Sequence, residues 1–172
     1  MTLLFIDYES YFDDIYTLSG NKAMSIDNYV LDERFHCHGA AVKIDDQPSK
    51  WYDVYSEDFY NEVILNIDFK ETTVIAHNNY FDGFISAQRF QWKPKQWLCT
   101  MCMGRGLFGP DVSNNLDSLS IRLGGRGKTD RVDFTKGKKV LTPSEMERLA
   151  AYSIADNEEC AALFNKMIKT YP

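Results

Sequence analysis

The stretch Thr2-Leu3-Leu4-Phe5-Ile6-Asp7-Tyr8-Glu9 decides how this chain folds. Its first five residues are apolar or β-branched, and a short run of that kind predicts a strand buried on both faces. Asp7 closes this strand, and Glu9 follows two residues later, so extended backbone puts both carboxylates on one face. The pattern predicts an acidic site at one end of a sheet, although two acids after a strand can also be ordinary surface residues.

A second acidic motif follows another predicted strand. The β-branched run 72–76 predicts that strand, and His77-Asn78-Asn79-Tyr80-Phe81-Asp82 spans its junction with a helix. Sites in α/β proteins collect at such junctions. The alternative is that Asn78 or Asn79 caps the helix while Asp82 complements its positive end. We expect His77 to be a structural, hydrogen-bonded residue.

A third acidic motif lies near the C-terminus. Tyr152 and Asp156 are four residues apart, and on a helix this spacing puts the phenol and the carboxylate on one face. A tyrosine at this spacing can also be a packing residue. Its relation to the two earlier motifs indicates a site in which Asp156 holds a metal and Tyr152 reaches the attacking water.

Four converging carboxylates cannot all stay ionised unless cations compensate their charge. Hard oxygen ligands select Mg²⁺ or Mn²⁺, and two such ions about 3.5–4 Å apart make a site for in-line displacement at phosphorus. We therefore predict a nuclease that uses two divalent cations. The predicted metal ligands are Asp7, Glu9, Asp82 and Asp156, and Tyr152 completes the predicted catalytic set.

The length and composition set limits on the protein class. The chain has 172 residues, of which 44% are hydrophobic and 26% are charged. This length suits one well-packed domain, which we expect to cover residues 1–172. No apolar run approaches a membrane span, and the N-terminal apolar run is too short for a signal peptide. We expect no membrane partner and a cytoplasmic protein, in the host cytoplasm if a phage encodes it.

The four cysteines are expected to be free thiols in that compartment. Cys99 and Cys102 form a CxxC, and His36 and His38 could supply imidazoles, so a zinc site is an alternative. A lone CxxC is weak support for zinc, and buried thiols are the simpler interpretation.

The charge is unevenly distributed. The formal net charge is −6, but residues 122–139 hold seven basic and two acidic residues, a net +5 that leaves −11 for the remainder. A basic segment beside an acidic metal site suits a phosphodiester substrate. We therefore predict that Lys136, Lys138 and Lys139 contact the substrate backbone. The alternative is an ordinary solvated loop.

Periodicity and turn residues predict a mixed sheet with helices on its faces. The predicted strands are 2–7, 36–44, 50–55, 72–76 and 96–100. The predicted helices are 57–67, 79–90, 101–108 and 116–123, the last capped by Asn114 or Asn115. A capping box at Thr142 starts two further helical stretches, one through Tyr152 and one through Met167.

The three motifs resemble Exo I, Exo II and Exo III of the DEDD exonuclease superfamily, which includes the proofreading domains of DNA polymerases. Asp-x-Glu matches residues 7–9, Asn-x-x-Phe-Asp matches 78–82, and Tyr-x-x-x-Asp matches 152–156. The tyrosine in the third motif marks the tyrosine branch. The histidine branch would have His where Ala151 stands.

Other segments are similar to the N-terminal exonuclease region of bacteriophage family A DNA polymerases. They are residues 24–30 with Arg34-Phe35, Cys99-Thr100-Met101 and Leu116-Asp117-Ser118-Leu119. No polymerase domain fits in 172 residues. We expect either a separate exonuclease or a proofreading domain alone, and favour the separate protein.

The resemblance implies an α/β, ribonuclease H-like fold with a five-stranded mixed sheet flanked by helices. It implies hydrolysis of DNA from the 3′ end with release of nucleoside 5′-monophosphates, in phage DNA replication, proofreading or DNA degradation. By position, Asp7, Glu9 and Asp156 would hold one cation. Asp7 would share the second cation with Asp82, and Tyr152 would orient the water.

The resemblance also implies partners. Single-stranded DNA or DNA 3′ ends would be bound near the first two motifs, by Tyr8, Asn78 and Phe81, although Phe81 could instead be a core residue. A DNA polymerase is a further expected partner. Two other interpretations stay open: an RNA 3′–5′ exonuclease of the same superfamily, because the metal chemistry does not read the 2′-hydroxyl, and a non-catalytic nucleic-acid-binding module.

Overall fold

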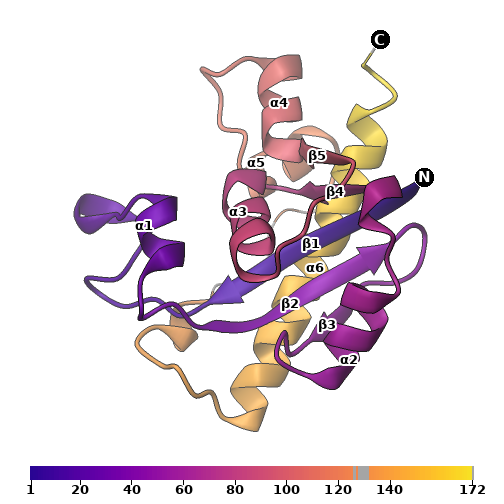
Figure 1. Cartoon of the computed structure of the whole chain (residues 1–172). Helices are drawn as coiled ribbons and strands as arrows, with labels where there is room; N and C mark the ends of the chain where they lie inside the picture. Colours follow the sequence, from indigo (N-terminus) through magenta and orange to yellow (C-terminus); the bar gives the residue numbers. More distant parts are fainter. Residues whose placement is uncertain (126, 128–131, 172) are drawn as a thin grey trace.

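The computed structural model describes residues 1–125, 127 and 132–171. They form a five-stranded mixed sheet with helices on both faces (Figure 1). The strand order is β3-β2-β1-β4-β5. The strands are β1 (Thr2–Ser10), β2 (Cys37–Ile44), β3 (Lys50–Tyr52), β4 (Thr72–Ala76) and β5 (Gln96–Cys99). The predicted fold class is confirmed.

Six α-helices surround the sheet in the described part of the chain. They are α1 (Ile26–Leu31), α2 (Glu57–Phe59), α3 (Asn79–Arg89), α4 (Thr100–Phe108), α5 (Leu116–Arg122) and α6 (Pro143–Met167). Short 3₁₀ turns lie at Gly20–Lys22, Phe69–Glu71 and Asp133–Thr135, and α2 continues as a π-helical segment, Tyr60–Leu65. In Figure 1, α2 and α3 lie in front of the sheet and α6 crosses behind it. No described helix is long and apolar enough to cross a bilayer.

The central strand β1 is longer than predicted. It runs antiparallel to β2 from Leu4 to Ser10, but parallel to β4 only from Thr2 to Phe5. The predicted end of the strand at Asp7 is therefore wrong, because pairing with β2 extends it. Asp7 lies where β1 has already passed the end of β4, so one edge of the strand is open beside it.

Alternate residues of β1 face two different cores. Ile6 packs into a core that includes Ile85 of α3. Phe5 packs into a second core with Phe164 of α6, and the two ring centroids are 5.6 Å apart. Because strand side chains alternate, Asp7 lies on the face that α6 covers.

The long helix α6 is continuous over 25 residues, whereas the sequence predicted two stretches that meet at Tyr152. Thr142 forms the predicted capping box with Glu145. No Gly or Pro follows Pro143 inside the helix, and one face stays buried along its length, so no break occurs. The third acidic motif therefore sits in the middle of a rigid element.

His38 is a buried, neutral imidazole on β2. Its exposed fraction is 4%, and neither ring nitrogen has a hydrogen-bond partner among the described residues. Burial, and then the neighbouring His36, lower the pKa of His38 from 6.5 to about 4. The folded state therefore favours the uncharged ring.

We predict that His38 makes the fold sensitive to acid. Its stabilising contribution is complete above pH 6.5, the ordinary pKa, and is lost as the pH falls toward 4. His38→Leu should reduce this acid-induced loss of unfolding free energy by roughly 1–3 kcal/mol. Urea unfolding at a series of pH values measures the difference between the two proteins. If the unfolding free energy falls equally in the wild type and in His38→Leu as the pH is lowered, His38 is protonated without destabilising the fold.

Candidate active site

Contacts between β1 and α6 place Asp7 beside the third acidic motif. The fully buried Ser153 donates a hydrogen bond to Asp7 Oδ2 at 2.7 Å. Asn157, one turn further along α6, donates to the Phe5 carbonyl at 3.4 Å. These bonds hold the helix across the strand, so Asp7 faces the turn of α6 that carries Tyr152.

Asp82 reaches the same strand from α3. Its exposed fraction is 4%, and its Oδ1 accepts the backbone N–H of Tyr8 at 3.1 Å. The carboxylate thus takes the place of a strand partner where β1 has passed the end of β4. Burial, and then the negative charge of Asp7, raise the pKa of Asp82 well above its ordinary value.

Tyr152 faces the acids from α6. Burial is the largest cause that raises its pKa, followed by the charges of Asp156 and Glu9. A hydrogen bond with Asp156 and the charge of Asp7 raise this pKa further. The phenol therefore keeps its proton, and it lies within electrostatic reach of three of the four predicted carboxylates.

The donor set fits a hard divalent cation. All four acids offer carboxylate oxygens, and the repulsion between Asp7 and Asp82 is the kind that a bound cation relieves. Within the described residues, no group of three or more His, Cys, Asp or Glu side chains is arranged to hold a metal ion as it stands.

The same finding covers the alternative zinc site at Cys99 and Cys102, for which the described residues show no ligand cluster. All four cysteines are free thiols, as predicted. His77 is a structural residue, as expected, because its Nδ1 is hydrogen-bonded to Thr100 Oγ1 at 2.9 Å.

A groove of about 230 Å³ opens beside Glu9. Phe81 of α3 and Tyr29 of α1 line it together with Leu18 and Val132. It combines apolar walls with hydroxyl groups next to an acid, which suits a nucleoside with a flat base and a polar sugar.

Two of the three residues that were predicted to grip the 3′ end, Tyr8 and Phe81, line this groove. Asn78 sits at the N-cap of α3 but makes no capping hydrogen bond with its side chain. Tyr8 contributes to the groove lining, but it is largely buried: its ring stacks on Phe90 and its hydroxyl accepts a hydrogen bond from Ser86. Alternation turns Tyr8 to the core face of β1, and its role toward a substrate stays a prediction, like those of Asn78 and Phe81.

The predicted backbone-binding lysines have protein partners. Lys136 pairs with Asp14, Lys138 pairs with Glu145, and the Lys139 ammonium lies 5.3 Å from the centre of the Tyr11 ring. Their role toward a substrate stays a prediction. Residues 126 and 128–131 of the same basic segment lie outside the described residues.

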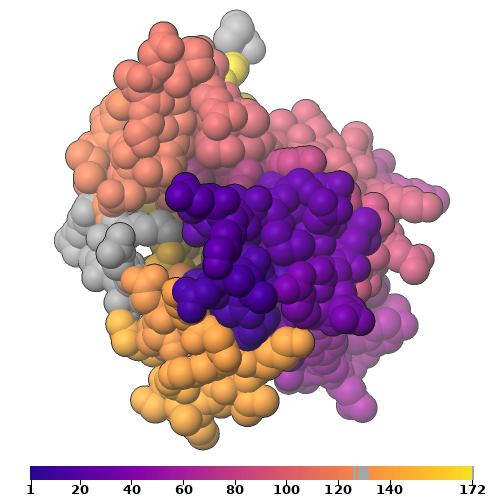
Figure 2. All heavy atoms as spheres, turned by 90° about the vertical axis from the view of Figure 1, so that its left-hand side faces the viewer, coloured from indigo at the N-terminus to yellow at the C-terminus, as the bar shows by residue number. Residues whose placement is uncertain are grey.

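Two features of the site were not found from the sequence. The first is Ser153. It lies three residues before Asp156 on the same helical face, and this spacing could have marked it as a site residue. The other is the segment 11–35, which packs against the end of β1. In Figure 2 this segment, in dark purple, occupies the middle of the face, between residues near 110 above and residues near 140 below. The contacts of the segment 11–35 join residues that are far apart in the sequence, and no local sequence pattern predicts such contacts.

The comparison with solved structures finds chains of similar fold. Brucella melitensis NrnC matches with a TM-score of 0.61 and 16% identity, over 97% of this chain and 72% of that one. The same protein with bound Mg²⁺ matches at 0.60 and 16%, over 97% and 72%. Bound to pGG, it matches at 0.59 and 17%, over 98% and 74%.

At these identities the likeness concerns the fold, which is ribonuclease H-like. No protein-family model matches the chain. No curated protein matches it either. The narrower resemblance to bacteriophage polymerases stays a prediction.

We predict that Ser153→Ala weakens cation binding through Asp7. The variant loses the 2.7 Å hydrogen bond that orients Asp7 Oδ2, and losing such a partner of a metal ligand typically costs about 10–100-fold in affinity or activity. Mn²⁺ titration by calorimetry measures the change. Ser118→Ala, at a half-buried serine on α5, serves as the control. Unchanged Mn²⁺ affinity in Ser153→Ala would show that this bond does not orient the ligand.

Proposed function

We propose that this protein is a divalent-cation-dependent 3′–5′ exonuclease. The observation that carries the proposal is the convergence of Asp7, Asp82 and the Tyr152–Asp156 pair at the open end of β1. Catalysis of phosphodiester hydrolysis needs charge compensation for a phosphate, which cations held by these acids would supply, and a positioned water, which Tyr152 would orient. The bound cations would supply a Lewis acid and a nucleophilic water at neutral pH.

The side chains have separate roles in this proposal. Asp7 would hold both cations, Glu9 and Asp156 would share the first with it, and Asp82 would contact the second. Tyr152 keeps its proton because burial and the nearby acids raise its pKa. It would therefore orient the attacking water by a hydrogen bond and not act as a base.

The groove beside Glu9 would hold the terminal nucleoside. Phe81 offers an aromatic surface for the base there. The scissile phosphate would then lie over the acids at the open edge of β1. A strand end would fit this position more readily than an internal linkage, because the groove is small and Glu9 lines it.

DNA is the proposed substrate, and RNA is the second candidate. A solved structure of Brucella NrnC is bound to pGG, which supports short oligonucleotides as a substrate class for this chain. The cation chemistry does not distinguish the two sugars. A DNA polymerase as partner, and a role in replication or proofreading, are parts of the proposal that rest on the sequence resemblance alone.

The proposal is tested with matched DNA and RNA single strands labelled at the 5′ end, incubated with Mg²⁺. An exonuclease working from the 3′ end produces a ladder that shortens one nucleotide at a time, with mononucleotide 5′-phosphates as product. Faster loss of the DNA strand supports the leading proposal. Faster loss of RNA supports the second candidate, and an intact strand under all conditions would reject both.

We predict that loss of a cation ligand lowers the catalytic rate more than loss of the positioning phenol. Asp7→Asn should lower the single-turnover rate by at least about a thousandfold, because it removes the charge shared by both cations. Tyr152→Phe should lower it by about ten- to a thousandfold, the range of a positioning contact. Single-turnover rates at saturating Mg²⁺ compare the two. A Tyr152→Phe rate equal to wild type would make Tyr152 a packing residue.

A further inference from the structure

The backbone at the end of β1 is irregular next to Glu9. The register with β2 shifts between Glu9 and Ser10, which is the pattern of a β-bulge. Bulges beside active sites redirect a side chain and increase the local twist. The direction of the Glu9 carboxylate therefore depends on what holds the residues that follow the bulge.

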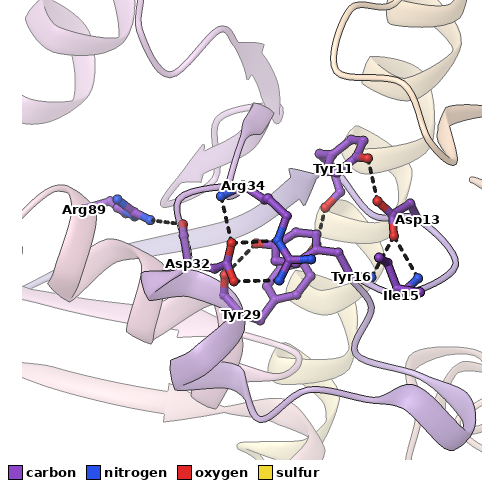
Figure 3. A network of polar contacts seen from close by, with 8 residues as sticks. All are labelled: Tyr11, Asp13, Ile15, Tyr16, Tyr29, Asp32, Arg34 and Arg89. Carbon is purple, nitrogen blue, oxygen red and sulfur yellow. Dashed lines mark hydrogen bonds and ion pairs between the residues drawn. The ribbon is translucent and has the colours of Figure 1, made fainter.

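Tyr29 of α1 holds these residues with one hydroxyl group. It donates a hydrogen bond to the Tyr11 carbonyl, drawn in Figure 3, and it is hydrogen-bonded to Ser10 Oγ at 3.0 Å. A phenol has one proton to donate, so Ser10 must be the donor in the second bond. One group thus ties together both residues after the bulge.

The position of Tyr29 is itself fixed by a stack of side chains (Figure 3). Its exposed fraction is 2%, and its ring stacks on Tyr16 with centroids 4.2 Å apart. The guanidinium of Arg34 covers the other face of the stack, 4.7 Å from the Tyr16 centroid, and Asp32 holds Arg34 by two hydrogen bonds of 2.7 and 2.8 Å. Tyr29 therefore has little freedom to follow a displaced strand end.

The phenol of Tyr29 stays protonated. Burial raises its pKa to about 12, and the charges of Cys37 and Glu9 add to the rise. Glu9 and Tyr29 also line the same groove. Tyr29 can therefore donate its hydrogen bond over the whole working range of pH.

We propose that Tyr29 is a positioning residue whose hydroxyl fixes the bulged end of β1 and so aims the Glu9 carboxylate at the cation site. This rests on the proposed function, in which Glu9 is a cation ligand. Tyr29 would touch neither the cation nor the reacting phosphate: its ring, which Tyr29→Phe retains, lines the groove beside Glu9, and its hydroxyl is held by Ser10 and Tyr11. Its effect is transmitted through the backbone of Ser10 and Tyr11.

The chain offers a matched control for this role. Tyr16 stands in the same stack, and its hydroxyl also donates to a backbone carbonyl, that of Tyr29, at 2.5 Å. Tyr16→Phe removes a buried hydrogen bond of the same kind, but one that lies within the 11–35 segment and not on β1. A general loss of stability would affect both variants, whereas loss of Glu9 positioning would affect Tyr29→Phe alone.

The experiment measures Mn²⁺ affinity by calorimetry, kcat and KM on a 3′ end, and melting temperature for wild type, Tyr29→Phe and Tyr16→Phe. We expect Tyr29→Phe to weaken Mn²⁺ binding and lower kcat by about 10–100-fold, with KM nearly unchanged. Tyr16→Phe should keep both values within about twofold of wild type. Ser10→Ala removes the hydroxyl that is hydrogen-bonded to Tyr29, and it should lower Mn²⁺ affinity and kcat in the same direction as Tyr29→Phe. This variant keeps the test usable if Tyr29→Phe folds poorly.

A double variant separates action through Glu9 from other effects. In the Glu9→Gln background, Tyr29→Phe should cause no further loss, because the group that it positions is already gone. Additive losses, or equal Mn²⁺ affinity in Tyr29→Phe and Tyr16→Phe, would overturn the proposal. Absence of Mn²⁺ binding by the wild type would overturn it as well. If the Mn²⁺ affinities of the wild type and the variants follow the expected pattern but the wild type cleaves no nucleic acid, the positioning role stands and the proposed function fails.

Discussion

Repulsion between carboxylates at the open end of β1 is the constraint on which the rest of the structure depends. Asp7 and Asp82 are close enough for the charge of one to raise the pKa of the other, and the buried Asp82 pays a desolvation cost as well. Proteins hold like charges together only where the surroundings enforce it. The elements around β1 hold these carboxylates together here. A bound divalent cation would relieve their repulsion, so the same repulsion favours cation binding.

Three elements enforce the arrangement. The central strand extends past β4 and leaves an edge where Asp82 replaces a strand partner. The long helix α6 is fastened across the strand by Ser153, so its middle turn delivers Tyr152. The segment 11–35 packs on the strand end and fixes the backbone after Glu9. Each element supplies a different side of the site, which explains why the motifs are far apart in the sequence.

The sheet, most helices and the acidic set could be predicted from the sequence, because they depend on local patterns such as the apolar run before Asp7. The end of β1 could not, since pairing with β2 decides it. The burial of Tyr8 follows from the register of the same pair. The ion pairs of Lys136 and Lys138 and the contacts of Tyr29 join residues that only the fold brings together.

The central claim is that the four acids share divalent cations. Crystals soaked in Mn²⁺ and measured near the manganese absorption edge test it most directly, because anomalous peaks locate each ion. We expect two peaks about 3.5–4 Å apart, bounded by Asp7, Glu9, Asp82 and Asp156. Fully ordered side chains with no peak among them, or peaks only elsewhere on the protein, would contradict the account.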